Sequence, residues 1–399
     1  MELDPLLLTL LFAAIAIGWL LGRAQVKRTA PSADSSSCSD SNLNPEYFQG
    51  LNYLMSDRTD EAIESFIRAL EINSDTIPAH LALARLLRRK GDVERAIRVH
   101  QTLLARPGLS RTDFHRIQMA LARDYEASGL LDRAENLLAG IITDHPSDLI
   151  AVEARKLLIK LYEKEGEWLD ALEVGRKLSS AEQQAMANEL SQYCCELAER
   201  ALDGKRWNLA EQYLREADGF DTHSVRASLL LARRHMEQDN WARAIKALCR
   251  VREQDPGMVS ETIADLKRCY EASDRLSAFD RYLDTCLATA PSTTVMLARA
   301  ERLCDEQGVI EAGLFITDEL KKRPSVRGLN RLIDMHLAHG SDSARESLTV
   351  LRGLTGQLEA DKPKYQCGHC GYAGRTLLWQ CPSCRQWNKI RPIQGLEGE

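Results

Sequence analysis

Four cysteines near the carboxyl end of the chain have the spacing of metal ligands. Cys367 and Cys370 form one C-x2-C pair, and Cys381 and Cys384 form a second pair after ten intervening residues. Each pair can place two thiolates on one tight turn, and two such turns complete a tetrahedron. Tetrahedral sites made of four thiolates take zinc or iron. The spacing therefore predicts one metal ion held by these four residues and leaves the choice between the two metals open.

The segment around these cysteines is predicted to be a small metal-binding domain, residues 361–399. About forty residues bury too little apolar surface to fold alone, and a bound metal can supply the missing stability. Four thiolates close the coordination shell, so no position stays open for catalysis. We expect His369 to be an exposed turn residue rather than a fifth ligand. Redox-active dithiols or two disulfides are the alternative interpretations of the cysteine pairs.

An alanine returns at nearly fixed intervals along most of the chain. The series is Ala62, Ala96, Ala134, Ala171, Ala210, Ala244, Ala278, Ala312 and Ala344, with intervals of 32 to 39 residues. A period near 34 resembles the tetratricopeptide repeat, in which each repeat is a pair of antiparallel helices. The series predicts an all-α fold for residues 43–360, a superhelical solenoid of about nine repeats whose surface holds other proteins.

Three tryptophans support this register. Trp168, Trp207 and Trp241 each precede an alanine of the series by three residues. A large apolar side chain at the start of the second helix can pack back on its partner helix. Because the position recurs in register, we interpret these rings as core residues rather than as a stacking surface for a ligand.

Charge and cysteine placement limit the function classes. The formal net charge is −6, which argues against general nucleic-acid binding. Six further cysteines are scattered through the repeats, as expected of free thiols in a reducing compartment. The chain lacks the short catalytic motifs of metalloproteases, P-loop enzymes and α/β-hydrolases. Glu163, Glu165 and Glu167 are expected at solvated helix ends, so the sequence predicts a protein that is not an enzyme.

The amino terminus is predicted to be a transmembrane anchor, residues 1–22. Leu6 to Gly22 carries no charge, and this length is at the short end of what spans a bilayer. The basic residues that follow predict a cytoplasmic location for the rest of the chain; they are Arg23, Lys27 and Arg28. The charge order differs from that of a cleaved signal peptide. Residues 23–42 are rich in serine and are expected to form a flexible cytoplasmic linker.

A basic strip is a candidate partner-binding surface. The first helix of each tetratricopeptide repeat faces the concave side, and counting in register puts six basic residues there: Arg85, Arg89, Arg116, Arg123, Lys156 and Lys160. Such a strip suits an acidic segment or a terminal carboxylate. The alternative is an ordinary solvated face that Glu126 and Glu163 partly neutralise.

The combination of anchor, repeats and cysteine pairs resembles the lipopolysaccharide assembly protein B family of Gram-negative bacteria. Local strings carry the resemblance: GDVERAIRVHQTL at 91–103, YCCELA at 193–198, ESLTVLR at 346–352, and a tail that begins KPKYQCGHCGY and continues LLWQCPSCRQWNKIRPIQGLEG. The similarity covers nearly the entire chain.

The resemblance implies a function. It implies an inner-membrane adaptor that helps the protease FtsH degrade the deacetylase LpxC and so regulates lipopolysaccharide synthesis. It also implies a rubredoxin-like tail, which favours iron, with the four cysteines as its ligands. An electron-transfer or redox-sensing protein with an iron site is the alternative, although that role leaves the repeats unexplained. Homo-oligomerisation stays open.

Overall fold

The structure is a computed structural model that describes residues 45–74, 76–144, 149–339, 345–396 and 398. These residues form two compact units, one that ends at Arg89 and one that begins at Lys90. The predicted anchor and linker lie outside the described residues. Within the described part of the chain, every helix is too short or too polar to cross a bilayer.

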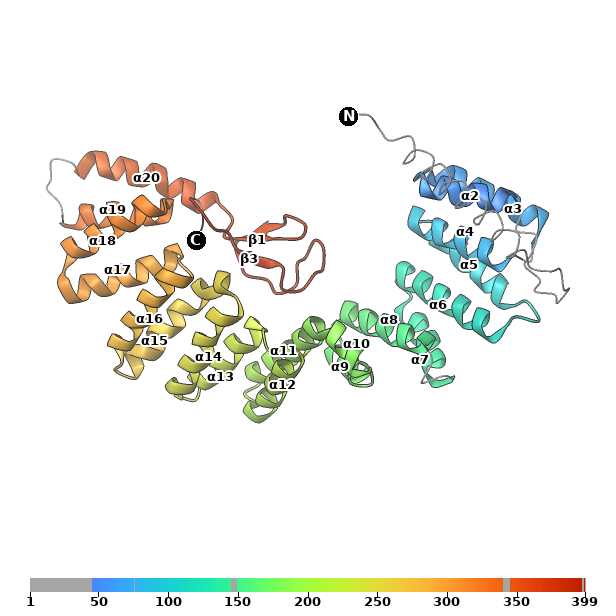
Figure 1. Cartoon of the computed structure of the whole chain (residues 1–399), viewed down its shortest axis with the longest axis horizontal. Helices are drawn as coiled ribbons and strands as arrows, with labels where there is room; N and C mark the ends of the chain where they lie inside the picture. Colours follow the sequence, from blue (N-terminus) through green and yellow to red (C-terminus); the bar gives the residue numbers. More distant parts are fainter. Residues whose placement is uncertain (1–44, 75, 145–148, 340–344, 397, 399) are drawn as a thin grey trace, which may run out of the picture. The chain divides into compact units, whose positions relative to one another are not determined.

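The regular elements among the described residues of the first compact unit are all helices (Figure 1). Its elements are α2 (Pro45–Met55), α3 (Thr59–Ile72) and α4 (Ile77–Lys90), which ends at the boundary. α2 and α3 form an antiparallel hairpin around the ring of Phe66, which is fully buried. Gly50 lies against this ring, and a Cβ at position 50 would come within 2.9 Å of it. A small residue is therefore required at this crossing.

The second compact unit continues the alternation of helices and ends in a small sheet. Its helices are α5 (Val93–Leu104), α6 (Arg111–Ser128), α7 (Leu131–Asp144), α8 (Leu149–Glu165), α9 (Trp168–Arg176), α10 (Ser180–Ala185), α11 (Ala187–Asp203), α12 (Trp207–Phe220), α13 (Val225–Met236), α14 (Trp241–Gln254), the 3-10 helix η1 (Pro256–Thr262), α15 (Ile263–Ala272), α16 (Leu276–Thr289), α17 (Thr293–Gln307), α18 (Val309–Lys322), α19 (Val326–His339) and α20 (Arg345–Asp361). From α6–α7 to α19–α20 each helix packs on the next along the chain, except that α9 packs on α11 across the short α10, and this confirms the predicted helical hairpins.

The alanine series marks the position where paired helices approach most closely. Seven of its members occupy the fourth residue of a second helix and are fully buried: Ala62, Ala96, Ala134, Ala171, Ala210, Ala244 and Ala312. The prediction for Ala278 is wrong by one residue, because Phe279 is the fourth residue of α16 and is fully buried, whereas Ala278 is only half-buried. Ala344 lies outside the described residues.

Backbone geometry confirms the corrected register. In the hairpins from α2–α3 to α15–α16, a residue with positive φ lies in the turn between the two helices, five positions before the buried fourth residue of the second helix. These residues are Asp57, Gly91, Gly129, Gly166, Lys205, Asp239 and Asp274; before Ala312, Gly308 has positive φ four positions ahead. Asp274 stands five residues before Phe279, so a phenylalanine takes the place of the small residue here. Counting alanines missed this because Ala278 happened to fit the period.

An inserted helix explains the longest interval of the series. The short helix α10 lies between α9 and α11, and it begins with a capping box in which Ser179 and Glu182 bond reciprocally. The added turn separates Ala171 from Ala210 by 39 residues. The insertion also precedes α11, the helix that later contacts the carboxyl-terminal sheet.

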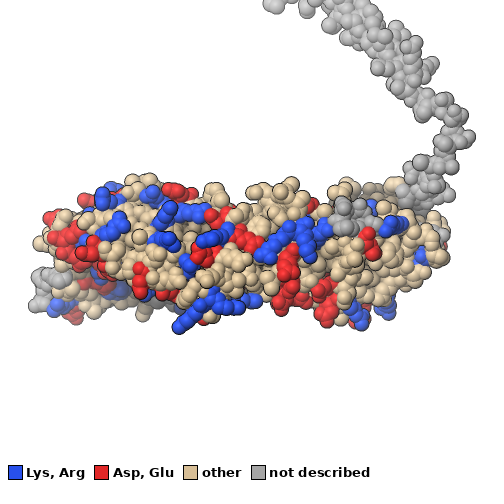
Figure 2. Space-filling model, turned by 90° about the horizontal axis from the view of Figure 1, so that it is seen from below, with Lys and Arg blue, Asp and Glu red and all other residues tan. Residues whose placement is uncertain are grey.

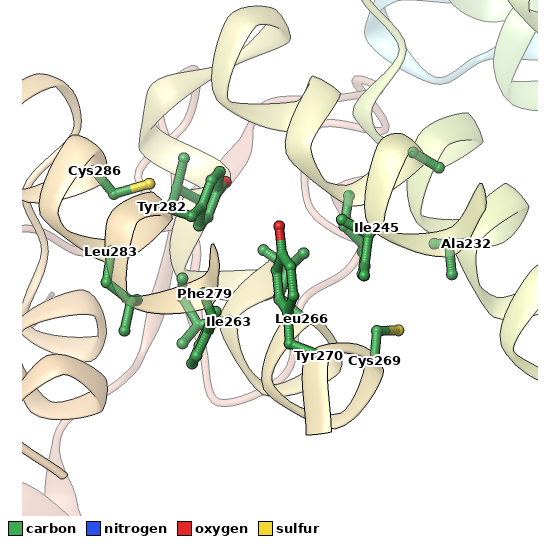
Figure 3. Packing of buried hydrophobic residues seen from close by; sticks show 14 of the residues in the cluster. Ala232, Ile245, Ile263, Leu266, Cys269, Tyr270, Phe279, Tyr282, Leu283 and Cys286 are labelled. Atoms are coloured by element: carbon green, nitrogen blue, oxygen red, sulfur yellow. The ribbon is translucent and has the colours of Figure 1, made fainter. Parts of the chain in front are cut away.

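Buried cysteines fill gaps in the helical core. Figure 3 shows the cluster between α13 and α17 that contains Phe279 and Tyr270, whose ring centroids lie 5.5 Å apart, together with Cys269 and Cys286. Burial raises the pKa of Cys269 to about 11 and that of Cys195, on α11, to about 12. These thiols stay protonated at neutral pH and act as small apolar groups.

The α15–α16 core gives a test of the register. Phe279→Ala should destabilise this hairpin by about 3–5 kcal/mol, because a large buried ring is replaced by a cavity. Hydrogen exchange should therefore accelerate in α15 and α16. Leu314→Ala on α18, where the side chain is 57% exposed, is the control and should leave exchange unchanged. Equal effects of the two variants would contradict the assignment.

Candidate metal centre and its seat on the repeats

The four predicted ligands come together at one point. Their Sγ atoms all lie within 4.8 Å of one another, with 3.8 Å between Cys367 and Cys384 and 3.6 Å between Cys370 and Cys381. Cys367 and Cys381 are buried, whereas Cys370 is exposed. A search of the described cysteine, histidine, aspartate and glutamate side chains finds these four cysteines as the group close enough together to share a metal ion.

Two matching turns hold these sulfurs. Gly371 donates its N–H to the carbonyl of Cys367 at 3.0 Å, and Arg385 donates to the carbonyl of Cys381 at 2.8 Å. Both donors have positive φ, 80° for Gly371 and 56° for Arg385. Only the first turn carries the glycine that such a backbone favours, so the sequence signals one turn more clearly than the other.

A three-stranded sheet supports the turns. β1 (Tyr365–Cys367) pairs antiparallel with β2 (Ala373–Gly374) on one side and with β3 (Ile390–Pro392) on the other. We call residues 365–392 the ribbon; its strands follow the carboxyl end of α20 in Figure 1. Ile390 packs against Cys367 and Cys381 in a very small core, so a bound ion must supply much of the stability.

The sulfur positions fit a four-coordinate ion. A tetrahedron with metal–sulfur bonds of about 2.3 Å has edges of about 3.8 Å, and the two closest sulfur pairs lie at 3.6 and 3.8 Å. The backbone N–H of Tyr372 lowers the pKa of Cys370, which favours the thiolate form that binds metal, whereas burial raises the pKa of Cys384 in the same cluster. His369 is exposed, as expected. The donor set suits zinc and iron equally.

The ribbon is seated on the repeats through one buried carboxylate. Glu163 on α8 accepts hydrogen bonds at Oε1 from the ribbon, from Gln380 Nε2 at 2.8 Å and from the Trp387 indole at 3.1 Å. Its Oε2 accepts from Tyr193 at 2.5 Å and pairs with Lys160 at 3.1 Å. The Glu163 side chain is only 6% exposed, so the prediction of a solvated helix end is wrong for this residue.

The reason for this error is tertiary. Glu165 and Glu167 are exposed, as predicted, and nothing in the local sequence separates Glu163 from them. Two of its donors come from the ribbon, more than 200 residues later in the chain. A buried carboxylate is tolerated only when hydrogen bonds replace its lost water, and here both oxygens are occupied. Burial and the nearby carboxylate raise the pKa of Tyr193, so its hydroxyl remains a donor.

Three aromatic rings surround this carboxylate. Trp168 stacks on Tyr193 with centroids 5.6 Å apart, and Trp387 meets both rings edge-on at 5.8 and 6.2 Å. Trp168 is therefore a core residue, as the register predicted. Trp168 packs against Trp387 of the ribbon as well as against residues of its own hairpin.

Further contacts join the ribbon to other helices of the second compact unit; together with the Glu163 contacts we call them the seam. Tyr365 donates to the Glu261 carboxylate on η1 at 3.1 Å, Arg391 pairs with Asp255 at 2.7 Å, and Asn388 bonds Asn188 on α11. The backbone N–H of Val326 on α19 donates to the carbonyl of Leu396 at 2.9 Å. The ribbon and the residues after it thus bind helices far apart in the sequence.

The six basic residues of the predicted strip lie on three first helices. Arg85 and Arg89 on α4 and Arg116 and Arg123 on α6 are exposed, and Lys156 and Lys160 on α8 are half-exposed. Several have acidic neighbours: Arg123 lies 3.9 Å from Glu153, Lys156 3.7 Å from Glu182, and Lys160 3.5 Å from Glu189. Figure 2 shows basic and acidic side chains interspersed on the face it presents. A continuous strip stays a prediction.

Comparison with known proteins agrees with both parts of the chain. The family model described as rubredoxin metal binding domain matches residues 365–392, and the tetratricopeptide repeat model matches residues 79–112. Lipopolysaccharide assembly protein B of Escherichia coli K12 is 33% identical over 98% of this chain and 99% of its own length, and the protein of that name from Haemophilus influenzae is 33% identical with the same coverage. The chain belongs to the lipopolysaccharide assembly protein B family.

A solved structure adds little to this assignment. A tetratricopeptide repeat protein from Parabacteroides merdae aligns with 78% of this chain and 97% of its own, at 14% identity and a TM-score of 0.30. The family assignment rests instead on the near full-length relatives.

The carboxylate seat can be tested by Glu163→Gln. The amide keeps one acceptor oxygen and places N–H groups against existing donors, so we expect docking of the ribbon to weaken by about 1–3 kcal/mol. Hydrogen exchange should accelerate in the ribbon, α8 and α11. Glu165→Gln, two residues away on the same helix and exposed, is the matched control. No difference between the variants would show that the seat does not depend on this charge.

The metal centre can be tested by Cys381→Ser. Loss of one buried thiolate should reduce bound metal from about one ion per chain to near zero and unfold the ribbon, since structural zinc contributes roughly 10–16 kcal/mol in small domains. Metal content by mass spectrometry and proteolysis of the ribbon are the readouts. Cys304→Ser, which changes a thiol on α17, should keep full occupancy.

Proposed function

We propose that this chain is a membrane-anchored cytoplasmic adaptor that presents the deacetylase LpxC to the inner-membrane protease FtsH and thereby regulates lipopolysaccharide synthesis. Membership of the lipopolysaccharide assembly protein B family supports the pathway. The stacked hairpins provide an extended surface for protein partners, as repeat arrays do. The observation that carries the proposal is the seam through Glu163, which ties the ribbon to the repeats.

The seam gives an adaptor a defined geometry. An adaptor must bind its client and the protease at the same time. The effective concentration of the client at the protease falls when the adaptor's geometry prevents both from binding together, so a fixed orientation is an advantage. Contacts between repeats are local, so a solenoid alone can bend. The ribbon contacts α8, α11 and η1 at once and restrains their relative positions. Anchoring by residues 1–22 would confine this surface to the plane of the membrane.

The basic residues on α6 and α8 are our candidates for contact with an acidic client segment. Two of them form ion pairs that solvent reaches, Arg123 with Glu153 at 3.9 Å and Lys156 with Glu182 at 3.7 Å. Exposed pairs contribute little free energy, so an incoming carboxylate can exchange with them at low cost. We extend the same role to Arg85 and Arg89 on α4.

The metal is assigned a structural part in this proposal. Cys367, Cys370, Cys381 and Cys384 would hold zinc or iron, and the ion would supply the ribbon with the stability that its core lacks. An iron centre with electron-transfer or redox-sensing chemistry is the second candidate, favoured by the exposure of Cys370. Zinc in the ribbon of the native protein would exclude it, since zinc has no redox chemistry.

LpxC turnover in the native host tests the proposal. Cells that carry the Arg116→Glu/Arg123→Glu variant should retain LpxC several-fold longer than wild-type cells, because reversed charges repel an acidic client. The matched control reverses two exposed lysines on α18, Lys321 and Lys322, and should leave the half-life unchanged. Normal LpxC turnover in cells lacking the whole chain would refute the adaptor role.

A further inference from the structure

A groove of about 450 Å³ runs along the first helices of three successive hairpins and is closed on one side by the ribbon. Glu199 on α11, Arg226 and Arg233 on α13, and Asp265 on α15 line it, and Trp379 is the ribbon's contribution. The groove is separate from the four cysteines and from the basic residues on α6 and α8.

Acidic groups outnumber basic groups in and around this groove. Arg226 is buried and pairs with two carboxylates, Glu196 at 2.9 Å and Glu199 at 2.6 Å. Arg233 likewise pairs with two carboxylates, Asp203 at 2.9 Å and Glu237 at 3.1 Å. Each guanidinium is therefore already matched by more negative charge than it carries.

Two further carboxylates face the groove from the α15 side. Glu261 lines the groove and accepts a hydrogen bond from the Tyr365 hydroxyl at 3.1 Å. Asp265 is half-buried and has Arg268 as its basic neighbour; burial raises the pKa of its carboxyl and Arg268 only partly opposes this. Four carboxylates and three guanidiniums line the groove. Two more carboxylates lie beside it, Glu196 paired with Arg226 and Asp203 paired with Arg233, and this excess of acidic groups favours a cation.

Apolar surface lies directly beside these charges. Leu229, Leu230 and Met236 on α13 line the groove, and the latter two are more than 90% buried. The indole of Trp379 forms the opposite wall, with the Arg226 guanidinium 5.8 Å from its centroid. An aliphatic side chain or the methylene stem of a lysine or arginine could rest on this surface while its charged end reaches a carboxylate.

We propose that this groove binds a basic segment of a partner protein, with an arginine or lysine side chain against Asp265 and Glu237 and a neighbouring apolar side chain against Met236 and Trp379. The inference deepens the adaptor role and rests on it for the existence of a partner. Binding here requires a docked ribbon, because Trp379 supplies one wall. A partner with segments of both signs could then engage this groove and the basic residues on α6 and α8 together.

Peptide titration on the full-length, metal-loaded protein tests this inference. The probe is a fluorescein-labelled twelve-residue peptide of alternating arginine and leucine, and the comparison peptide replaces every arginine with glutamate. We expect saturable binding of the basic peptide that weakens with salt, and no binding of the acidic one. The Glu237→Gln/Asp265→Asn variant should bind the basic peptide about tenfold more weakly.

A matched variant separates this groove from general attraction to an acidic protein. Glu311→Gln/Asp318→Asn removes the same charge from α18 and should bind like the wild type. Equal affinity of the groove variant and the wild type, or equal losses in the two variants, would overturn the proposal. Circular dichroism and metal content confirm that each variant is folded.

A second measurement distinguishes this inference from the adaptor proposal. In the Trp379→Leu variant, peptide affinity should fall while metal content stays at the wild-type level; unchanged affinity would contradict a ribbon wall. Failure of these titrations leaves LpxC turnover by the adaptor unaffected. Failure of the turnover experiment leaves the measured peptide affinity in place.

Discussion

The hydrogen bonds to the Glu163 carboxylate are the interaction on which the position of the ribbon against the helices of the second compact unit depends. The carboxylate lies in a nearly dry site, where an ionised group needs full hydrogen bonding. Gln380 and Trp387 of the ribbon bond one oxygen, while Tyr193 and Lys160 serve the other. Removal of the ribbon would leave Oε1 without these donors. The ribbon and the repeats are therefore energetically coupled, and a metal ion that stabilises the ribbon would act indirectly on the helices.

This coupling gives a physical reason for joining a metal ribbon to a repeat array. Helical repeats contact mainly their neighbours, which makes an array extended and compliant. The ribbon instead binds α8, α11, α13 and η1, which belong to different hairpins. A rigid cross-link of this kind can keep two binding surfaces at a constant separation. The adaptor role proposed above would depend on that property.

Charge on the first helices changes along the second compact unit. α6 and α8 carry Arg116, Arg123, Lys156 and Lys160, whereas the groove formed by α11, α13 and α15 has an excess of carboxylates. Opposite surfaces on one scaffold favour a partner with a matching pattern and disfavour partners of uniform charge. Net charge alone, at −6, conceals this distribution, because it sums over the whole chain.

The amino-acid sequence by itself determined the helical hairpins and the cluster of four cysteines. Both follow from local rules: small residues at a fixed period allow helices to approach, and C-x2-C turns place thiolates together. It failed at Ala278, where the turn residue Asp274 rather than the alanine count sets the register. It also failed at Glu163, whose environment is built by Gln380 and Trp387 from the far end of the chain. Only the tertiary structure decided where the ribbon sits and that Trp379 closes a groove, since burial and hydrogen-bond partners of a side chain depend on segments that sequence spacing cannot bring together.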